Sequence, residues 1–366
     1  MRVLYVAYPL LTVSPESAGG AEQVLWTLER EITHRGVCTT VAASEGSNVT
    51  GELFSTGQPC SAGDDFERRF REHQERVLEL IDRRARQSEA FDLIHDMTGS
   101  FWGRAAQIHA PVLATLHLPR EFYSPRLFEE VAPNVTFNCV SASQAKSFAG
   151  LDSMAGIVGN GIDLDRFAFP PGLGSERNHA GAATRCGLLW LGRICAEKAP
   201  HLALEIAQRA GMPITLAGQV YPFSYHRRYF DDEVAARLRT IPEVCFMPSP
   251  SLEEKAKLLR SAQAVLITSQ VAETSSLVAM EAAASGTPVI AFARGALPEV
   301  VCKGVTGFLA QGVDDAVHAL RHLHEIKSAA CRQHARDHFN SATMADGYAA
   351  LYAHILSRAQ APSCAA

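Results

Sequence analysis

Residues 273–281, ETSSLVAME, place Glu273 and Glu281 eight positions apart, on either side of a Ser/Thr cluster and the start of an apolar run. The run continues through MEAAASGTPVIAF (280–292), a pattern typical of a buried helix followed by a buried strand. A carboxylate inside such a helix is costly to bury unless a partner neutralises its charge. The stretch therefore raises the question of what Glu281 pairs with.

The Ser/Thr residues are helix N-cap signals, so we expect a helix that begins near Ser275 or Ser276 and ends at Gly286. Glu273 then lies in the loop before the helix, whereas Glu281 lies about 7 Å along it, at ~1.5 Å per residue. The free N–H groups and the positive end of the helix dipole favour a phosphate between the two acids. A capping box followed by a helix acid that faces water explains the same nine residues equally well.

This arrangement suits a ligand with an anionic centre and hydroxyl groups on both sides, as in a nucleotide-diphosphate sugar. Glu281 can accept hydrogen bonds from a ribose, and Glu273 from a sugar. LGRICAEK (191–198) also follows a strand-like run and brings Arg193 and Lys198 to the same edge of the sheet. Two cations can stabilise a diphosphate leaving group, whose negative charge increases during the reaction. An Arg and a Lys five positions apart are also common on solvated surfaces.

Strand-like apolar runs alternate with helical patterns along nearly all of the 366 residues. The alternation predicts βαβ units with parallel sheets buried on both faces, and ligands at the carboxyl ends of the strands. The runs form two series: 3–7, 39–43, 92–97, 112–117 and 135–141, then 187–193, 214–218, 244–249, 264–269 and 288–292.

The two series predict two doubly wound domains, at 1–168 and 186–342. The stretch between them, FPPGLGSERNHAGAATR (169–185), is rich in Gly, Pro and polar residues and is predicted to be a linker. A last amphipathic helix, 343–358, follows the second domain and can pack back on the first.

The composition is that of an ordinary globular protein, with 47% hydrophobic and 20% charged residues. A formal net charge of −5 gives no general attraction to nucleic acid. The nine cysteines are scattered singly, which indicates reduced thiols in a cytoplasmic protein and argues against a disulfide frame or a zinc cluster. No apolar run approaches the ~20 residues of a membrane span, and the N-terminal run favours a buried strand over a secretion signal.

Several other motifs have plain structural interpretations. FERRFREHQERVLELIDRRARQ (66–87) mixes both charge signs, which favours a solvated helix face over a membrane surface. DLD (163–165) imitates a metal-binding motif but lies where a connecting loop is expected. YPFSYHRRYF (221–230) predicts a loop that leads into a helix, and His95 and His109 are expected to be structural.

Three stretches, GRICAEK (192–198), AETSSLVAMEAAASGTPVIAFARGALPEVV (272–301) and GVTGFL (304–309), resemble the C-terminal domain of glycosyltransferase family 4. The N-terminal half agrees through GGAEQVLWTLEREITHRG, TLH, CVSASQ and GNGIDLDRF, in that order. The pattern is most similar to the avilamycin-type and pterin glucosyltransferase-like members. The resemblance implies a retaining enzyme of the GT-B fold, with two Rossmann-like domains whose parallel sheets face each other across a cleft.

The resemblance also implies a role for each matching residue. His117 would face the transferred sugar, and Glu273 would act on the sugar hydroxyls. The implied donor-binding residues are Gly19 and Gly20 in a glycine loop, Arg193 and Lys198 at the diphosphate, Ser276 with the amides of Leu277 and Val278 at the phosphate, and Glu281 at the ribose. The chain departs from the usual family pattern at Ser275-Ser276, where Phe-Gly is common, and at Ala296, where a second glycine is common.

The expected function is therefore transfer of a hexose from a nucleotide-diphosphate sugar to an unidentified acceptor hydroxyl, without a metal cofactor. UDP-glucose is the expected donor, because Ser251 stands where GDP-using relatives often carry an acid. The acceptor is expected to be a small molecule, a glycan or a lipid-linked sugar, and no nucleic-acid partner is expected. The alternatives are a catalytically silent sugar-nucleotide-binding protein and a GT-B epimerase.

Overall fold

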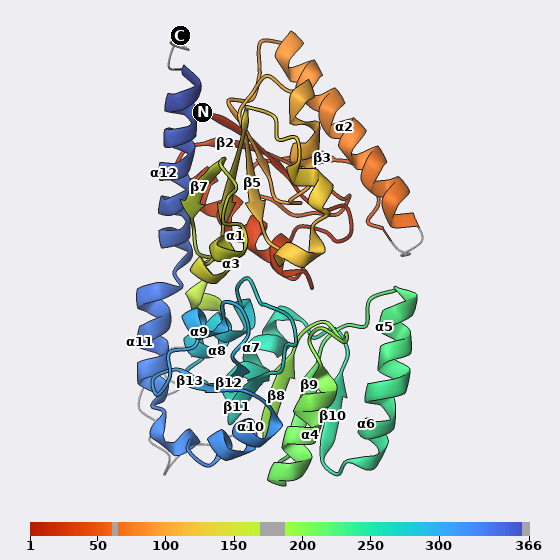
Figure 1. The fold of residues 1–366 in the computed structure, drawn as a ribbon, viewed down its shortest axis with the longest axis vertical. Helices are drawn as coiled ribbons and strands as arrows, with labels where there is room; N and C mark the ends of the chain where they lie inside the picture. Colours follow the sequence, from red (N-terminus) through yellow and green to blue (C-terminus); the bar gives the residue numbers. More distant parts are fainter. Residues whose placement is uncertain (61–64, 169–186, 361–366) are drawn as a thin grey trace. The chain divides into compact units, whose positions relative to one another are not determined.

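The structure is a computed structural model that describes residues 1–60, 65–168 and 187–360 (Figure 1). The chain divides into two compact units: unit 1 comprises residues 1–160 and 341–366, and unit 2 comprises residues 161–340. The predicted linker at 169–185 lies outside the described residues. Within the described parts of the chain, no helix has both the length and the apolar character needed to cross a bilayer.

Unit 1 is built on a fully parallel sheet of seven strands in the order β3-β2-β1-β4-β5-β6-β7. Its strands are β1 (Arg2–Val6), β2 (Cys38–Ala43), β3 (Glu52–Ser55), β4 (Leu93–Asp96), β5 (Val112–Leu116), β6 (Val135–Cys139) and β7 (Met154–Ile157). Its helices are α1 (Gly20–His34), α2 (Phe66–Arg86), α3 (Ala142–Ser147) and α12 (Ser341–Gln360).

Unit 2 repeats this plan with six parallel strands in the order β10-β9-β8-β11-β12-β13. The strands are β8 (Leu188–Leu191), β9 (Ile214–Ala217), β10 (Val244–Met247), β11 (Ala264–Ile267), β12 (Val289–Phe292) and β13 (Gly307–Ala310). The helices are α4 (Pro200–Ala210), α5 (Ser224–Tyr229), α6 (Ala236–Thr240), α7 (Leu252–Ser261), α8 (Leu277–Ala284), α9 (Leu297–Val300), α10 (Val313–Leu320) and α11 (Ser328–His338).

Both sheets are doubly wound around their first strand, so the predicted α/β class with two Rossmann-like units is confirmed. The order reverses between β1 and β4 in unit 1 and between β8 and β11 in unit 2. At such a switch point the loops after the two strands diverge and leave a crevice for a ligand. The ten predicted strands are all present, and the sequence analysis missed β3, β7 and β13 at the sheet edges.

The boundary between the units lies at residue 160, earlier than the predicted residue 168. Residues 161–168 pack with unit 2, because Ile162 and Phe167 are buried in its core. Ile162 also donates a backbone hydrogen bond of 2.8 Å to the carbonyl of Phe339. The last helix, α12, belongs to unit 1 and packs against α1 (Figure 1).

A buried chain of hydrogen bonds attaches α12 to the sheet of unit 1. The Tyr352 hydroxyl lies 3.0 Å from that of Tyr5 and 2.7 Å from His95 Nδ1, while His95 Nε2 lies 2.7 Å from Thr115 Oγ1. Thr115 donates to Asn138 Oδ1, so it accepts from His95 Nε2–H, and His95 Nδ1 accepts from Tyr352. Burial also lowers the pKa of His95 and keeps it neutral. Both ring nitrogens are engaged within the core, as the predicted structural role requires.

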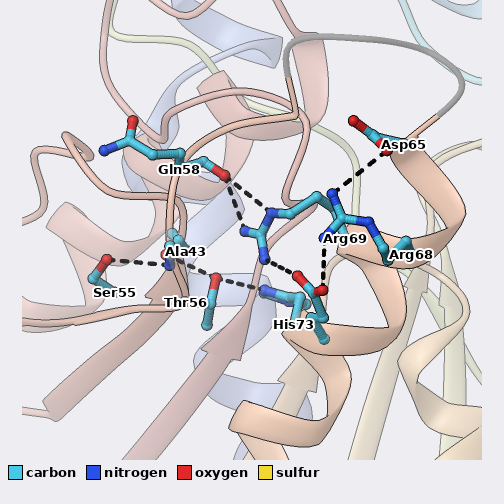
Figure 2. Close-up of polar contacts among 10 residues, drawn as sticks. Ala43, Ser55, Thr56, Gln58, Asp65, Arg68, Arg69 and His73 are labelled. Carbon is cyan, nitrogen blue, oxygen red and sulfur yellow. Dashed lines mark hydrogen bonds and ion pairs between the residues drawn. The ribbon is translucent and has the colours of Figure 1, made fainter.

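Helix α2 is held at the exit of β3 by polar contacts (Figure 2). The Thr56 hydroxyl donates to the carbonyl of Ala43 (3.1 Å) and lies 2.8 Å from Nδ1 of the buried His73. Arg69 Nη2 donates to the carbonyl of Gln58 at 3.0 Å. The rest of α2 is mostly exposed charge, which confirms the predicted solvated helix face.

We predict that Tyr352→Phe lowers the free energy of unfolding of unit 1 by roughly 2–4 kcal/mol, because Tyr5 and His95 would each keep an unpaired polar group at about 1–3 kcal/mol. Urea denaturation of the full chain measures the change. The control is Tyr225→Phe, since Tyr225 is 57% exposed. Equal stability of the two variants would show that the buried chain of hydrogen bonds does not hold α12.

Candidate functional site

The helix predicted from the opening stretch is α8, at the switch point of unit 2. Ser276 is its N-cap and accepts a hydrogen bond from the Ala279 amide at 3.3 Å. The helix closes at Gly286, which has a φ of +67°. The amides of Leu277 and Val278 precede the first intrahelical bonds and therefore point toward any ligand at this end. The predicted start and end of the helix are confirmed.

Glu281 is 2% exposed, as the apolar sequence around it predicted. Its Oε1 accepts a hydrogen bond from Lys255 Nζ at 2.6 Å, which identifies the partner of the buried acid. Burial raises the pKa of the Glu281 carboxyl, and the nearby ammonium opposes that shift. The second oxygen, Oε2, is buried and has no hydrogen-bond partner among the described residues. Glu281 therefore has one acceptor atom left for a ligand donor.

The sequence analysis did not identify Lys255. It lies on α7, which begins with a capping box between Ser251 and Glu254. The Ser251 hydroxyl is engaged in this box, because it accepts from the Glu254 amide at 3.3 Å. The signal that could have revealed Lys255 is Glu281 itself, since a buried carboxylate requires a cation on a neighbouring element.

Glu273 and Lys198 form an ion pair, with 2.5 Å between Lys198 Nζ and Glu273 Oε1. The same oxygen accepts a hydrogen bond from the Ser269 hydroxyl, another contact that the sequence analysis missed. Glu273 is 9% exposed, whereas the side chain of Lys198 is 33% exposed. Two residues expected on different parts of a ligand thus neutralise each other in this structure.

The backbone of Glu273 is fixed by the loop after β12. Gly295 has a φ of +55°, and a Cβ at this position would lie 2.2 Å from the carbonyl oxygen of Glu273. The next amide, of Ala296, donates to that carbonyl at 2.6 Å. Both the left-handed conformation and the close approach therefore require glycine at 295. Ala296, where the family pattern often has a second glycine, is fully buried.

Arg193 and Lys198 lie on one loop, residues 192–198, directly after β8. The loop is fixed by backbone bonds, among them Ile194 N to Gln219 O at 2.9 Å. The Thr268 hydroxyl donates to the carbonyl of Lys198 at 3.0 Å. The guanidinium of Arg193 lies over the ring of Tyr221, 5.5 Å from its centre. Since β8 and β11 are neighbours, this loop and the segment from Glu273 to α8 leave the sheet side by side.

The remaining predicted residues belong to unit 1. Gly19 is the N-cap of α1, Gly20 is its first residue, and a Cβ at position 19 would lie 1.9 Å from Oε2 of Glu22. Glu22, which the sequence analysis missed, is buried, and burial raises its pKa to about 7. His117 follows β5 directly, and desolvation lowers its pKa to about 4, so the imidazole is neutral.

The first acid of the DLD motif forms an ion pair close by in the sequence. Asp163 Oδ2 pairs with Arg166 Nε at 2.9 Å within the same short turn. This pair agrees with the predicted connecting-loop role.

The sequence resembles known glycosyltransferases. Residues 182–338 match the family described as glycosyl transferases group 1. A D-inositol 3-phosphate glycosyltransferase of Geodermatophilus obscurus is 33% identical over 193 residues, which cover 49% of this chain and 43% of that protein. The protein of the same name from Mycolicibacterium smegmatis is 32% identical over 237 residues, 62% of this chain and 54% of that one. The chain thus matches less than two thirds of the length of either relative.

Solved structures share the fold over nearly the whole chain. AviGT4, a glycosyltransferase involved in avilamycin A biosynthesis, aligns with a TM-score of 0.70 at 22% identity over 98% of both chains. HepE of Anabaena in complex with UDP and glucose aligns with a TM-score of 0.72 at 18% identity, over 97% of this chain and 100% of that one. These similarities confirm the predicted GT-B fold class.

We predict that Lys255→Met lowers the free energy of unfolding of unit 2 by about 3–5 kcal/mol, because it leaves a buried carboxylate without its cation. Adding Glu281→Gln to the same chain should recover most of that loss, since the two residues act as a pair. Chemical denaturation of both variants gives the coupling.

Lys257→Met is the matched control, because Lys257 lies on the same helix and is exposed. If Lys255→Met and Lys257→Met lose equal stability, the buried ion pair does not stabilise unit 2.

Proposed function

We propose that this chain is a GT4-type glycosyltransferase that transfers a hexose from a nucleotide-diphosphate sugar to an acceptor hydroxyl with retention of configuration. The observation that carries the proposal is the vacant, buried Oε2 of Glu281 behind the free N-terminal amides of α8. A cation pair and an acid lie on the adjoining loops. This combination at a switch point fits a ligand that has hydroxyl groups on both sides of an anion.

In the proposed complex the diphosphate lies at the N-terminus of α8, against the amides of Leu277 and Val278. Arg193 and Lys198 neutralise its charge. The ribose hydroxyls donate to Glu281, whose second oxygen is vacant. The sugar hydroxyls donate to Glu273, which is paired with Lys198 in the ligand-free structure.

Transfer then requires stabilisation of the charge that grows on the leaving phosphate. Arg193, Lys198 and the helix amides are fixed donors that supply it, so we propose that no metal is required. The acceptor hydroxyl attacks the anomeric carbon from the face that the phosphate leaves, and the departing phosphate oxygen takes the acceptor proton. His117 is neutral, so it can share a hydrogen bond with the sugar without adding a second cation near the anomeric carbon.

UDP-glucose is the proposed donor. The HepE structures bound to UDP, glucose or UDP-glucose make it a reasonable first choice. D-inositol 3-phosphate is a suitable first acceptor to test, because the relatives reported above are named for it.

The proposal predicts that UDP and UDP-glucose raise the melting temperature of the purified chain in proportion to the logarithm of their concentration. Product formation from UDP-glucose, with D-inositol 3-phosphate as the acceptor, should then continue in excess EDTA. Donor hydrolysis serves as the readout when the acceptor is wrong. Binding without hydrolysis or transfer would favour a silent binding protein, and turnover that EDTA abolishes and Mg²⁺ restores would refute metal independence.

A second experiment should show different roles for Glu273 and Glu281. Glu281→Gln should weaken binding of free UDP by an amount on the order of 1.5–3 kcal/mol, because the ribose loses a charged acceptor. Glu273→Gln should leave UDP affinity nearly unchanged and lower turnover sharply, because Glu273 acts only on the sugar. Calorimetric titration with UDP measures both variants, and equal losses of affinity would place the two acids on the same part of the donor.

A further inference from the structure

Three side chains of unit 2 that the proposed reaction does not use converge on one point. The Sγ of Cys195, a carboxylate oxygen of Glu197 and a ring nitrogen of His226 all lie within 4.8 Å of one another. Cys195 and Glu197 come from the loop after β8, and His226 comes from α5, which follows β9. Since β8 and β9 are neighbours, the fold itself brings the three together.

His226 is the unusual member of this group. It is 1% exposed, and neither ring nitrogen has a hydrogen-bond partner among the described residues. The rings of Tyr221, Phe223 and Tyr225 surround it, with centroids 4.3–5.9 Å away. A buried imidazole with no hydrogen bond is destabilising, because its polar atoms have lost water without gaining a partner. Its position beside a thiol and a carboxylate supplies the explanation.

We propose that Cys195, Glu197 and His226 bind a zinc ion. Thiolate, imidazole and carboxylate are all ligands of Zn²⁺, and three protein ligands leave the fourth tetrahedral position to water. Binding deprotonates the Cys195 thiol and releases the proton to solvent. The thiolate and the Glu197 carboxylate then supply two negative charges, which match the charge of the ion.

The distances are close to those that one ion requires. With bonds of about 2.3 Å to sulfur and 2.1 Å to nitrogen, a tetrahedral angle places the two ligand atoms about 3.6 Å apart. The three ligand atoms lie within 4.8 Å of one another, so binding requires the side chains to move by up to about 1 Å. Mg²⁺ and Ca²⁺ are poorer candidates, because both prefer sites made of oxygen atoms.

The proposed site lies on the loop that carries Arg193 and Lys198, and the charge of Arg193 is close enough to lower the pKa of Glu197 and to oppose the raised pKa of Cys195. The ion would connect this loop to α5. The loop is already fixed without it, through Ile194 N to Gln219 O (2.9 Å) and Gln270 N to Glu197 O (2.8 Å). Zinc would therefore add a connection to a loop whose backbone is already fixed.

Cobalt substitution tests the site on the full chain, purified without a polyhistidine tag. Titration with Co²⁺ should give a sulfur-to-cobalt charge-transfer band that saturates at one equivalent, and Zn²⁺ should displace it. Cys195→Ser should abolish the band, and His226→Ala, which removes a direct ligand, should weaken cobalt binding by more than the ~10-fold that loss of an outer-shell partner costs. The matched controls are Cys245→Ser and His324→Ala, because both residues are exposed.

A second measurement does not depend on any variant folding. X-ray absorption of the zinc-loaded parent chain should show one sulfur and two or three lighter ligands in the first shell. A shell without sulfur, or a cobalt band that survives Cys195→Ser, would overturn the proposal. Retention of nucleotide binding by the metal-free chain keeps this test separate from that of the proposed transferase activity.

Discussion

The buried charge of Glu281 determines how helices α7 and α8 pack in unit 2. A carboxylate with 2% exposure persists in an apolar helix only if a cation reaches it, and Lys255 on α7 supplies that cation. The pair therefore requires α7 and α8 to lie side by side, on the strands that precede them. One oxygen of Glu281 is satisfied and the other is vacant, so the pair holds the helix in place and still leaves an acceptor for a ligand.

The two units use the same sheet order but stabilise it with different buried polar groups. In unit 1, α12 is attached through hydrogen bonds between neutral side chains. Tyr352 and His95 each donate one of these bonds and accept another. Unit 2 places ion pairs at its switch point instead. Neutral networks rigidify a core without requiring a counter-charge, whereas ion pairs can exchange one partner for a charged ligand. This difference agrees with a donor site in unit 2.

The sequence was sufficient for the central strands, because long apolar runs identify strands buried on both faces. It was insufficient for the edge strands β3, β7 and β13, in which partly exposed residues interrupt the buried apolar pattern. The positions of Glu273, Glu281 and the start of α8 were predictable from capping signals and apolar context. Lys255 and Ser269 were not, since their contacts depend on how elements pack, and the scattered cysteines gave no sign of the cluster formed by Cys195, Glu197 and His226.

The pair between Lys198 and Glu273 shows how such a site can remain stable when it is empty. A partly buried cation or carboxylate without a partner destabilises the folded protein. Lys198 Nζ and Glu273 Oε1 lie 2.5 Å apart, so each charge has a partner in the ligand-free protein. On the proposed function, Lys198, whose side chain is 33% exposed, also contacts the diphosphate, while the sugar hydroxyls donate to Glu273. The intact donor therefore gives each of the two side chains a further partner.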